Sequence, residues 1–200
     1  MKRYEIIDDC VPSPVQDEIE NQLFEHMPLY YLKGTIREYD TSLNPWLVYS
    51  KAEQCVDEPF FFHMLYRDGE VSSDWFNMVT PIAEALLKPE ANWRKNIIRI
   101  KANLQMKNGC VKEGSYNAPH KDTKGTHTVL LYYINDNDTD TIFWEELGDG
   151  NIKEHARVKA KKGRCVVFDG DWLHASAIPR ISEKAVVNIV ISKSINEIIK

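Results

Sequence analysis

The stretch from Asn96 to Met106 alternates between apolar and polar side chains. The apolar set is Ile98, Ile100, Ala102, Leu104 and Met106, and the intervening polar set is Arg99, Lys101, Asn103 and Gln105. Because successive side chains of a β-strand point to opposite faces, this pattern predicts a strand with one face in a core and one polar face.

The second half of the chain continues as short apolar runs separated by turn-forming residues, such as Asn135-Asp136-Asn137-Asp138. We expect strands at Thr128 to Ile134, Thr141 to Glu145, Ile152 to Val158, Arg164 to Phe168 and Lys184 to Ser192. Short strands at this close spacing favour a β-sandwich or a jelly-roll.

The first half of the chain is predicted to be richer in helix. After a short strand at Tyr4 to Ile7, Ser13 is a candidate N-cap residue, Pro14 suits the first helical position and Gln16 completes a capping box. Apolar residues then recur every four positions, at Val15, Ile19, Leu23 and Met27. This period predicts an amphipathic helix that runs to about His26.

A second helix is expected from Ser73 or Asp74 to about Leu87, where Pro81 either kinks the helix or marks a restart. Before it, the run from Pro59 to Tyr66 is apolar enough to be buried. Because no repeat, low-complexity tract or linker divides the chain, residues 1–200 are predicted to form one domain. A helical lead-in over about 1–95 would precede a strand-rich core over about 96–194, giving a mainly β fold with flanking α-helices.

The charge balance argues against a protein whose main task is to grip nucleic acid, because that task needs a basic surface. The formal net charge is −5 and the sequence pI is about 5.7, so strong nonspecific nucleic acid binding is not expected. The later part of the chain is the more basic, with 19 Lys and Arg against 15 Asp and Glu from Trp75 onward. It could attract an anion, although a solvated surface is the commoner reading of such a bias.

The cysteines and the hydropathy pattern predict a cytoplasmic protein. Four cysteines are spread widely and form no Cys-x-x-Cys pair, so reduced, structural thiols are expected: Cys10, Cys55, Cys110 and Cys165. No apolar run is long enough for a signal peptide or a membrane span, so no membrane partner is expected.

Candidate chemistry begins with His120-Lys121-Asp122. Two residues apart in extended chain, the imidazole and the carboxylate project to the same side and can share one ion. The pair is weak evidence alone, and His174, after an apolar strand opened by Gly163, supplies a third candidate ligand. A single histidine there is more often a hydrogen-bonded core residue. Together, however, His120, Asp122 and His174 make the two-histidine, one-carboxylate facial triad that suits Fe(II).

These residues also carry a resemblance to a known family. The segment from about Ile98 to Ile191 resembles the double-stranded β-helix (jelly-roll, cupin-like) of the Fe(II)/2-oxoglutarate-dependent oxygenase superfamily, in its prolyl-4-hydroxylase-like branch. The similarity rests on the order and spacing of His120-Lys121-Asp122, Tyr132-Tyr133-Ile134-Asn135, the strand from Gly163 to Phe168, His174 and Lys184.

The resemblance implies which residues bind the cosubstrate. Lys184 would pair with the distal carboxylate of 2-oxoglutarate, and Arg180 is the competitor; we prefer Lys184 because Arg180 follows Pro179 in an expected loop. The Tyr133 hydroxyl would contact the same carboxylate, unless a register shift of one residue turns Tyr132 inward instead. Asn103, on the polar strand face, is a further candidate contact for cofactor or substrate.

The implied activity is a hydroxylase whose catalytic centre is the iron held by His120, Asp122 and His174. Such an enzyme uses Fe(II), 2-oxoglutarate and O2 to hydroxylate a C–H bond and releases succinate and CO2, with ascorbate as a candidate reductant. Two alternatives stay open, a non-catalytic metal-binding jelly-roll module and a purely structural scaffold. A protein side chain, a nucleobase or a small metabolite would all fit as the primary substrate.

Overall fold

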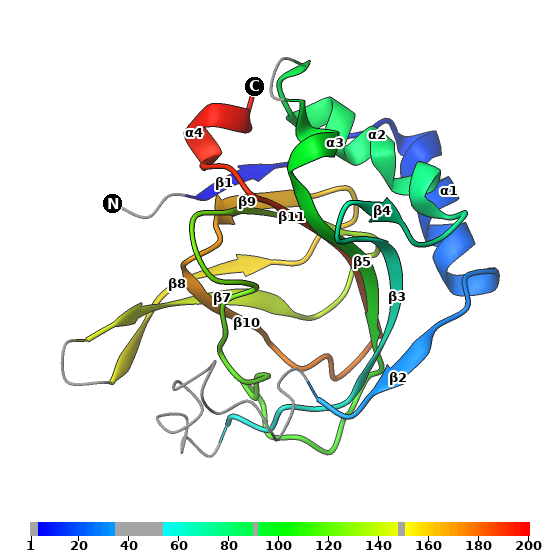
Figure 1. The fold of residues 1–200 in the computed structure, drawn as a ribbon. Helices are drawn as coiled ribbons and strands as arrows, with labels where there is room; N and C mark the ends of the chain where they lie inside the picture. The colour runs from blue at the N-terminus through cyan, green and yellow to red at the C-terminus, as the bar shows by residue number, and fades with distance from the viewer. Residues whose placement is uncertain (1–3, 35–53, 90–91, 148–150) are drawn as a thin grey trace.

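Two β-sheets form most of the protein, which we describe from a computed structural model over residues 4–34, 54–89, 92–147 and 151–200 (Figure 1). The large antiparallel sheet has the strand order β1-β9-β6-β11-β5-β3-β2, with β4 paired to β3. Its strands are β1 (Tyr4–Ile7), β2 (Tyr30–Leu32), β3 (Phe60–Arg67), β4 (Glu70–Val71), β5 (Ile97–Gln105), β6 (Thr128–Tyr133), β9 (Cys165–Asp169) and β11 (Lys184–Ile191). The smaller sheet has the order β10-β7-β8, formed by β7 (Asp140–Glu146), β8 (Ile152–Lys159) and β10 (Leu173–Ser176).

The helices cover one face of the large sheet, and the smaller sheet lies on its other side (Figure 1). They are α1 (Ser13–Glu25), α2 (Phe76–Leu86), α3 (Trp93–Asn96) and α4 (Ile195–Ile198). This arrangement confirms the expected mainly β fold with flanking α-helices. No helix of the described residues is long and apolar enough to cross a membrane.

Two apolar clusters lie on opposite faces of the large sheet, because successive side chains of its strands point to opposite faces. On β6, Val129, Leu131 and Tyr133 pack between the two sheets. Leu130 and Tyr132 point the other way, into the cluster shared with the helices. Strands that are buried on both faces read as continuous apolar runs, which is why the sequence of β6 shows no alternation.

Most predicted elements occur within a residue or two of the expected bounds, but the predicted N-cap of α1 is wrong. The helix begins at Ser13, Pro12 occupies the cap position, and no side chain caps it. The Gln16 amide, predicted to complete a capping box, donates instead to the Val11 carbonyl at 2.8 Å. The apolar face of the helix is buried as predicted, through Ile19 and Leu23.

The strands that the sequence did not predict are short or irregular. The aromatic run before α2 is strand β3, and Tyr30–Leu32 pairs with it as the edge strand β2. His174, for which no separate element was predicted, lies in strand β10, which pairs with β7. Pro81 lies inside α2, which continues through it and begins at Phe76, two residues after Asp74.

Candidate metal centre and active-site pocket

His120 and His174 are brought together by backbone pairing. They face each other in an antiparallel bridge, in which the His120 amide donates to the His174 carbonyl at 2.9 Å and the His174 amide donates back at 3.0 Å. Directly opposed residues of such a pair have side chains on the same side. The two imidazole rings accordingly lie with their centroids 4.9 Å apart.

The second nitrogen of each imidazole fixes how the ring can bind a metal. His120 Nδ1 lies 3.0 Å from the Ala118 carbonyl, and His174 Nδ1 lies 2.9 Å from the Trp172 carbonyl. Because a carbonyl only accepts, each Nδ1 carries the hydrogen, and each Nε2 keeps its lone pair for a metal. This is the orientation that a facial triad requires.

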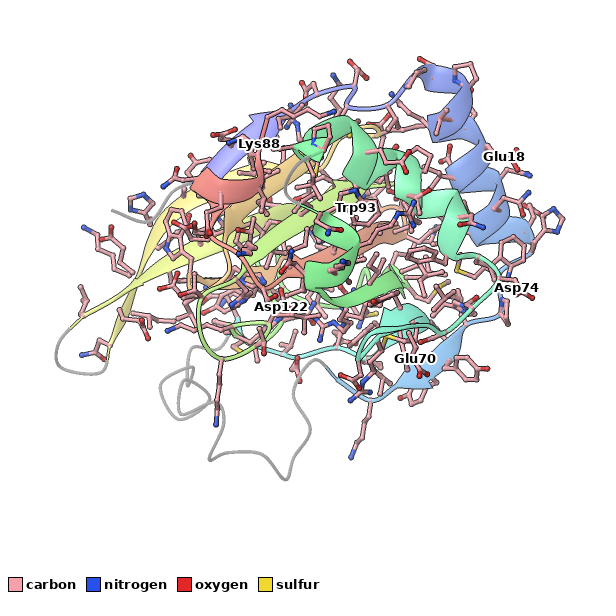
Figure 2. The ribbon with its side chains drawn as sticks, turned by 45° about the horizontal axis from the view of Figure 1, so that its top comes forward. Glu18, Glu70, Asp74, Lys88, Trp93 and Asp122 are labelled. Atoms are coloured by element: carbon pink, nitrogen blue, oxygen red, sulfur yellow. The ribbon has the colours of Figure 1, made fainter. Side chains whose placement is uncertain are left out.

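Asp122 completes the group, and Figure 2 shows it well inside the outline of the molecule. Its Oδ2 lies 3.5 Å from His174 Nε2, and one ligand atom from each of His120, Asp122 and His174 lies within 4.8 Å of the others. Arg99 donates to Oδ1 and Asn188 donates to Oδ2 at 3.3 Å. The three side chains that the sequence singled out therefore converge, with the carboxylate held from two sides.

The protonation states also suit metal binding. Burial and the neighbouring His174 lower the pKa of His120 to about 4, so its ring is neutral at physiological pH. Burial alone would raise the pKa of Asp122, but Arg99 and the two histidines outweigh it and hold that pKa well below its usual value. A metal ligand must be deprotonated, and both groups are ready in that form.

A pocket extends from this centre between the two sheets. It encloses about 660 Å³, part of it open to solvent, and Asn103, Thr141, Ser176 and Lys184 line it together with the three candidate ligands. The Asn103 Oδ1 atom is buried and has no hydrogen-bond partner among the described residues. Since a buried polar atom is costly without a partner, Asn103 is suited to contact a bound molecule.

Lys184 lies within this pocket, where the sequence placed it at the start of β11. Its ammonium donates to the Ser176 hydroxyl and lies 5.6 Å from the centre of the Tyr133 ring. No carboxylate of the described residues forms an ion pair with it, and burial lowers its pKa to about 7. An ammonium in this setting is stabilised by an added anion.

Tyr133, and not Tyr132, faces the interior between the sheets. The Tyr133 ring packs beneath Lys184, but its hydroxyl bonds with the Thr141 hydroxyl and lies 3.4 Å from the Val158 carbonyl. The hydroxyl is thus engaged with the smaller sheet, which leaves the ring as the part of Tyr133 that adjoins the lysine.

Arg180, the competitor of Lys184, does not line the pocket. Its backbone amide donates to Asp138, and its side chain is 38% exposed with a guanidinium nitrogen 3.8 Å from Glu113. Sequence reasoning did not single out Arg99 or Ser176, which contact Asp122 and Lys184. The signal for Arg99 was present, because it belongs to the polar set that alternates along β5.

Solved structures with a similar fold include a 2OG-Fe(II) oxygenase family member, an α-ketoglutarate-dependent epimerase and a prolyl-4-hydroxylase. An oxidoreductase of the 2OG-Fe(II) oxygenase family from Burkholderia pseudomallei matches with a TM-score of 0.59 at 10% identity, over 96% of this chain and 86% of its own. SnoN, a non-haem α-ketoglutarate-dependent epimerase of nogalamycin biosynthesis, gives 0.57 at 13% identity, over 96% and 79%. A Pseudomonas putida prolyl-4-hydroxylase gives 0.52 at 11% identity, over 96% and 94%.

No sequence-family model and no curated protein sequence matches the chain. At identities this low, the structural likeness establishes the fold. The chain folds as the jelly-roll, or double-stranded β-helix, of the Fe(II)/2-oxoglutarate-dependent oxygenases, as the sequence resemblance predicted.

Proposed function

We propose that this protein is an Fe(II)- and 2-oxoglutarate-dependent dioxygenase in which His120, Asp122 and His174 hold the iron. The observation that carries the proposal is the convergence of two Nε2 atoms and one carboxylate at the edge of a pocket. Three protein ligands on one face leave the remaining coordination positions of an iron for exogenous ligands. A structural zinc site, closed by four protein ligands, would not have this character.

Lys184 is our proposed partner for the distal carboxylate of 2-oxoglutarate. The ammonium is buried, faces the same pocket as the metal ligands and lacks a carboxylate partner among the described residues. Asn103 offers a further contact through its unpartnered oxygen. Tyr133 supports the lysine with its ring, and we assign no cosubstrate contact to Arg180, because its side chain lies outside the pocket lining.

The proposed reaction is hydroxylation of a C–H bond, with release of succinate and CO2. Iron, 2-oxoglutarate and O2 supply the oxidising chemistry when bound, and the protein orients them and shields them from water. SnoN, with the same fold, is described as an epimerase, so the identity of the product is a necessary part of the assignment. We place the protein in the cytoplasm as a single domain, with ascorbate as a candidate reductant.

The test combines iron binding with turnover. The wild-type protein, given Fe(II), 2-oxoglutarate, O2 and ascorbate, is expected to release succinate, and His174→Ala is expected to abolish both iron binding and succinate release. His26→Ala, which removes an exposed histidine just after α1, is the matched control and should leave both unchanged. Undiminished turnover in His174→Ala would refute the ligand assignment. Metal binding by the wild type without any turnover would favour the non-catalytic module.

A further inference from the structure

A groove on the inner face of the large sheet begins where the metal pocket ends. It shares Asp122 and Lys101 with that pocket and runs along β5 and β3 toward the edge strand β2. Its lining is mixed. Leu32, Phe62 and Met64 form an apolar side, and the polar side includes Arg67, Asp68 and Thr123. The groove encloses about 810 Å³ with its open mouth. This size is within the range of small-molecule sites, and the groove opens directly beside a candidate iron ligand.

The charged side chains of the groove are already paired, with one exception. Arg67 forms an ion pair with Asp68 at 3.1 Å, and Arg99 pairs with Asp122. Lys101 lines both cavities, and its ammonium lies 5.5 Å from the centre of the Phe60 ring. No carboxylate of the described residues lies within ion-pair distance of it. Lys101 is therefore a cation at the junction of the two cavities that has an aromatic neighbour and no anion of its own.

With iron and 2-oxoglutarate bound, the site would still lack an anion to pair with Lys101. Burial and the nearby Arg99 lower the pKa of Lys101 to about 8, although Asp122 partly offsets them, so the ammonium is mostly protonated at neutral pH. Of the negative groups, Asp122 is engaged by Arg99, and the distal carboxylate of 2-oxoglutarate would pair with Lys184. Iron at +2 adds more positive charge than the second carboxylate of 2-oxoglutarate removes. The cationic groups thus exceed the carboxylates, and an enclosed excess charge favours an anionic partner.

Lys101 and Lys184 lie at different positions along the sheet. Lys184 stands opposite Gln105, and Lys101 stands opposite Asn188, four residues farther along β11. Four residues of strand correspond to about 13 Å. Both lysines line the metal pocket, but of the two only Lys101 also lines the groove, which makes Lys101 the candidate for a second anion position there.

We propose that Lys101 binds an anionic group of the primary substrate, a carboxylate or a phosphate, and that the apolar side of the groove, formed by Leu32, Phe62 and Met64, accepts the apolar body attached to it. This inference rests on the proposed function, because the groove is a substrate site only if the neighbouring residues hold a catalytic iron. The substrate class is accordingly a small amphipathic anion. Its anionic end lies at the junction of the cavities, which brings a neighbouring C–H bond close to the metal centre.

The test uses three probes that share one alkyl chain and differ in charge: octanoate, octyl phosphate and octanamide. Each is titrated by calorimetry into anaerobic protein loaded with Mn(II) and 2-oxoglutarate. We expect at least one anion to bind about tenfold more tightly than octanamide. The stronger of the two anions identifies the carboxylate or the phosphate as the better fit.

Variants of Lys101 decide whether this residue is responsible. Lys101→Met should weaken binding of the anion about tenfold and leave octanamide unchanged, whereas Lys101→Arg should retain anion binding. Lys95→Met removes an exposed lysine in α3 and is the charge-matched control, expected to behave as wild type. The proposal is overturned if the amide binds as well as the anions, if neither anion binds at about 10 mM, or if Lys101→Met binds the anion normally.

Failure of the proposed function is visible separately. It would appear as a wild-type protein that binds neither Mn(II) nor 2-oxoglutarate in the loading step. A Lys101→Met variant that loses affinity for 2-oxoglutarate, while anion binding in the groove is unaffected, would instead assign Lys101 to the cosubstrate and overturn the present inference.

Discussion

The two faces of β11 show how one strand serves stability on one side and chemistry on the other. Ala185, Val187 and Ile189 face the helices and are fully buried in the larger apolar cluster. Lys184 and Asn188 alternate with them and face the metal pocket. The outer face is uniform and apolar, as a core should be. The inner face carries polar groups at positions that would be cheaper to fill with apolar side chains.

This difference separates residues that stabilise the folded state from residues that are present at some cost to its stability. A buried apolar side chain stabilises the folded state wherever it packs well. A buried ammonium without a carboxylate partner destabilises it. Polar side chains among the apolar ones on the inner face, which also carries Val186 and Val190, therefore indicate that selection there acts on something other than stability.

The largest expected effect is on the outer face. Leu130→Ala on β6 removes a fully buried side chain from the cluster between the large sheet and the helices. We expect the free energy of unfolding to fall by about 3 kcal/mol, because the cavity adds to the lost transfer energy. Urea unfolding measures the loss. The affinity of the folded protein for 2-oxoglutarate should stay as in wild type, and a large change in that affinity would break the separation of the two faces.

Lys184→Met on the inner face should have the opposite effects: weaker binding of 2-oxoglutarate without a loss of stability. We expect the affinity for 2-oxoglutarate to fall about a hundredfold, which is about 2.7 kcal/mol of binding energy. The stability of the ligand-free protein should rise by about 1 kcal/mol, because a buried charge is replaced by a side chain of similar length. The Ser176 hydroxyl keeps its bond to the Ala177 carbonyl at 2.7 Å.

Calorimetry and thermal unfolding measure the two quantities for Lys184→Met. Lys153→Met, at an exposed position of β8, is the control and should change neither. A variant that is less stable and still binds 2-oxoglutarate normally would show that Lys184 serves the fold and not the ligand.

The sequence predicted which side chains face the pocket in two situations. One is a strand along which polar and apolar residues alternate, and the other is a motif with a characteristic spacing between its residues. The polar set along β5 pointed to Asn103, and the position of Lys184 relative to His174 pointed to the pocket. Gly163, with its positive φ of 78°, marks the turn into β9 as the motif suggested. These features are local, because their signals lie within about ten residues of each other.

Features that depend on pairing between distant segments could not be read from the sequence. Strand β10 is four residues long, and its strand character comes from its pairing with β7. The side-chain contact between Arg99 and Asp122 joins residues 23 positions apart. The Tyr133 hydroxyl turns to Thr141 because β7 lies beside it, which no pattern within β6 could indicate. The packing of distant segments determines such contacts, whereas the periodicity of the sequence determines only which face of a strand a side chain occupies.

Arg99→Gln tests the inner face further, because it removes the guanidinium that orients the candidate ligand Asp122 and leaves Asp122 itself in place. Arg99 occupies Oδ1 of Asp122 and leaves Oδ2 facing His174. Outer residues that orient a metal ligand typically contribute tenfold or more to metal affinity, so we expect about a tenfold loss in an anaerobic Fe(II) titration. Arg99→Lys should recover part of it. A gain in Fe(II) affinity would show instead that repulsion between the guanidinium and the metal outweighs orientation.

The smallest predicted effect is a pH dependence of cosubstrate binding. The pKa of Lys184 is lowered by burial to about 7 in the ligand-free protein, and a bound carboxylate should raise it. Below about pH 7 the lysine is already protonated, so its titration does not alter the affinity for 2-oxoglutarate. Above it, binding requires proton uptake, and the affinity should fall severalfold between pH 7 and 8, with tenfold per pH unit as the ceiling.

The stability of the ligand-free protein should follow the same titration with the opposite sign. The folded-state pKa of Lys184 lies below the value of 10.5 for an ordinary lysine, so the unfolded chain binds more protons between the two. The stability of wild type relative to Lys184→Met should therefore rise from about pH 7 toward pH 10.5. Lys101, with a pKa of about 8, titrates in the same range, and Lys101→Met isolates its share. A Lys184→Met protein with an unchanged pH profile for 2-oxoglutarate binding would assign the dependence to Lys101 and remove Lys184 from the anion site.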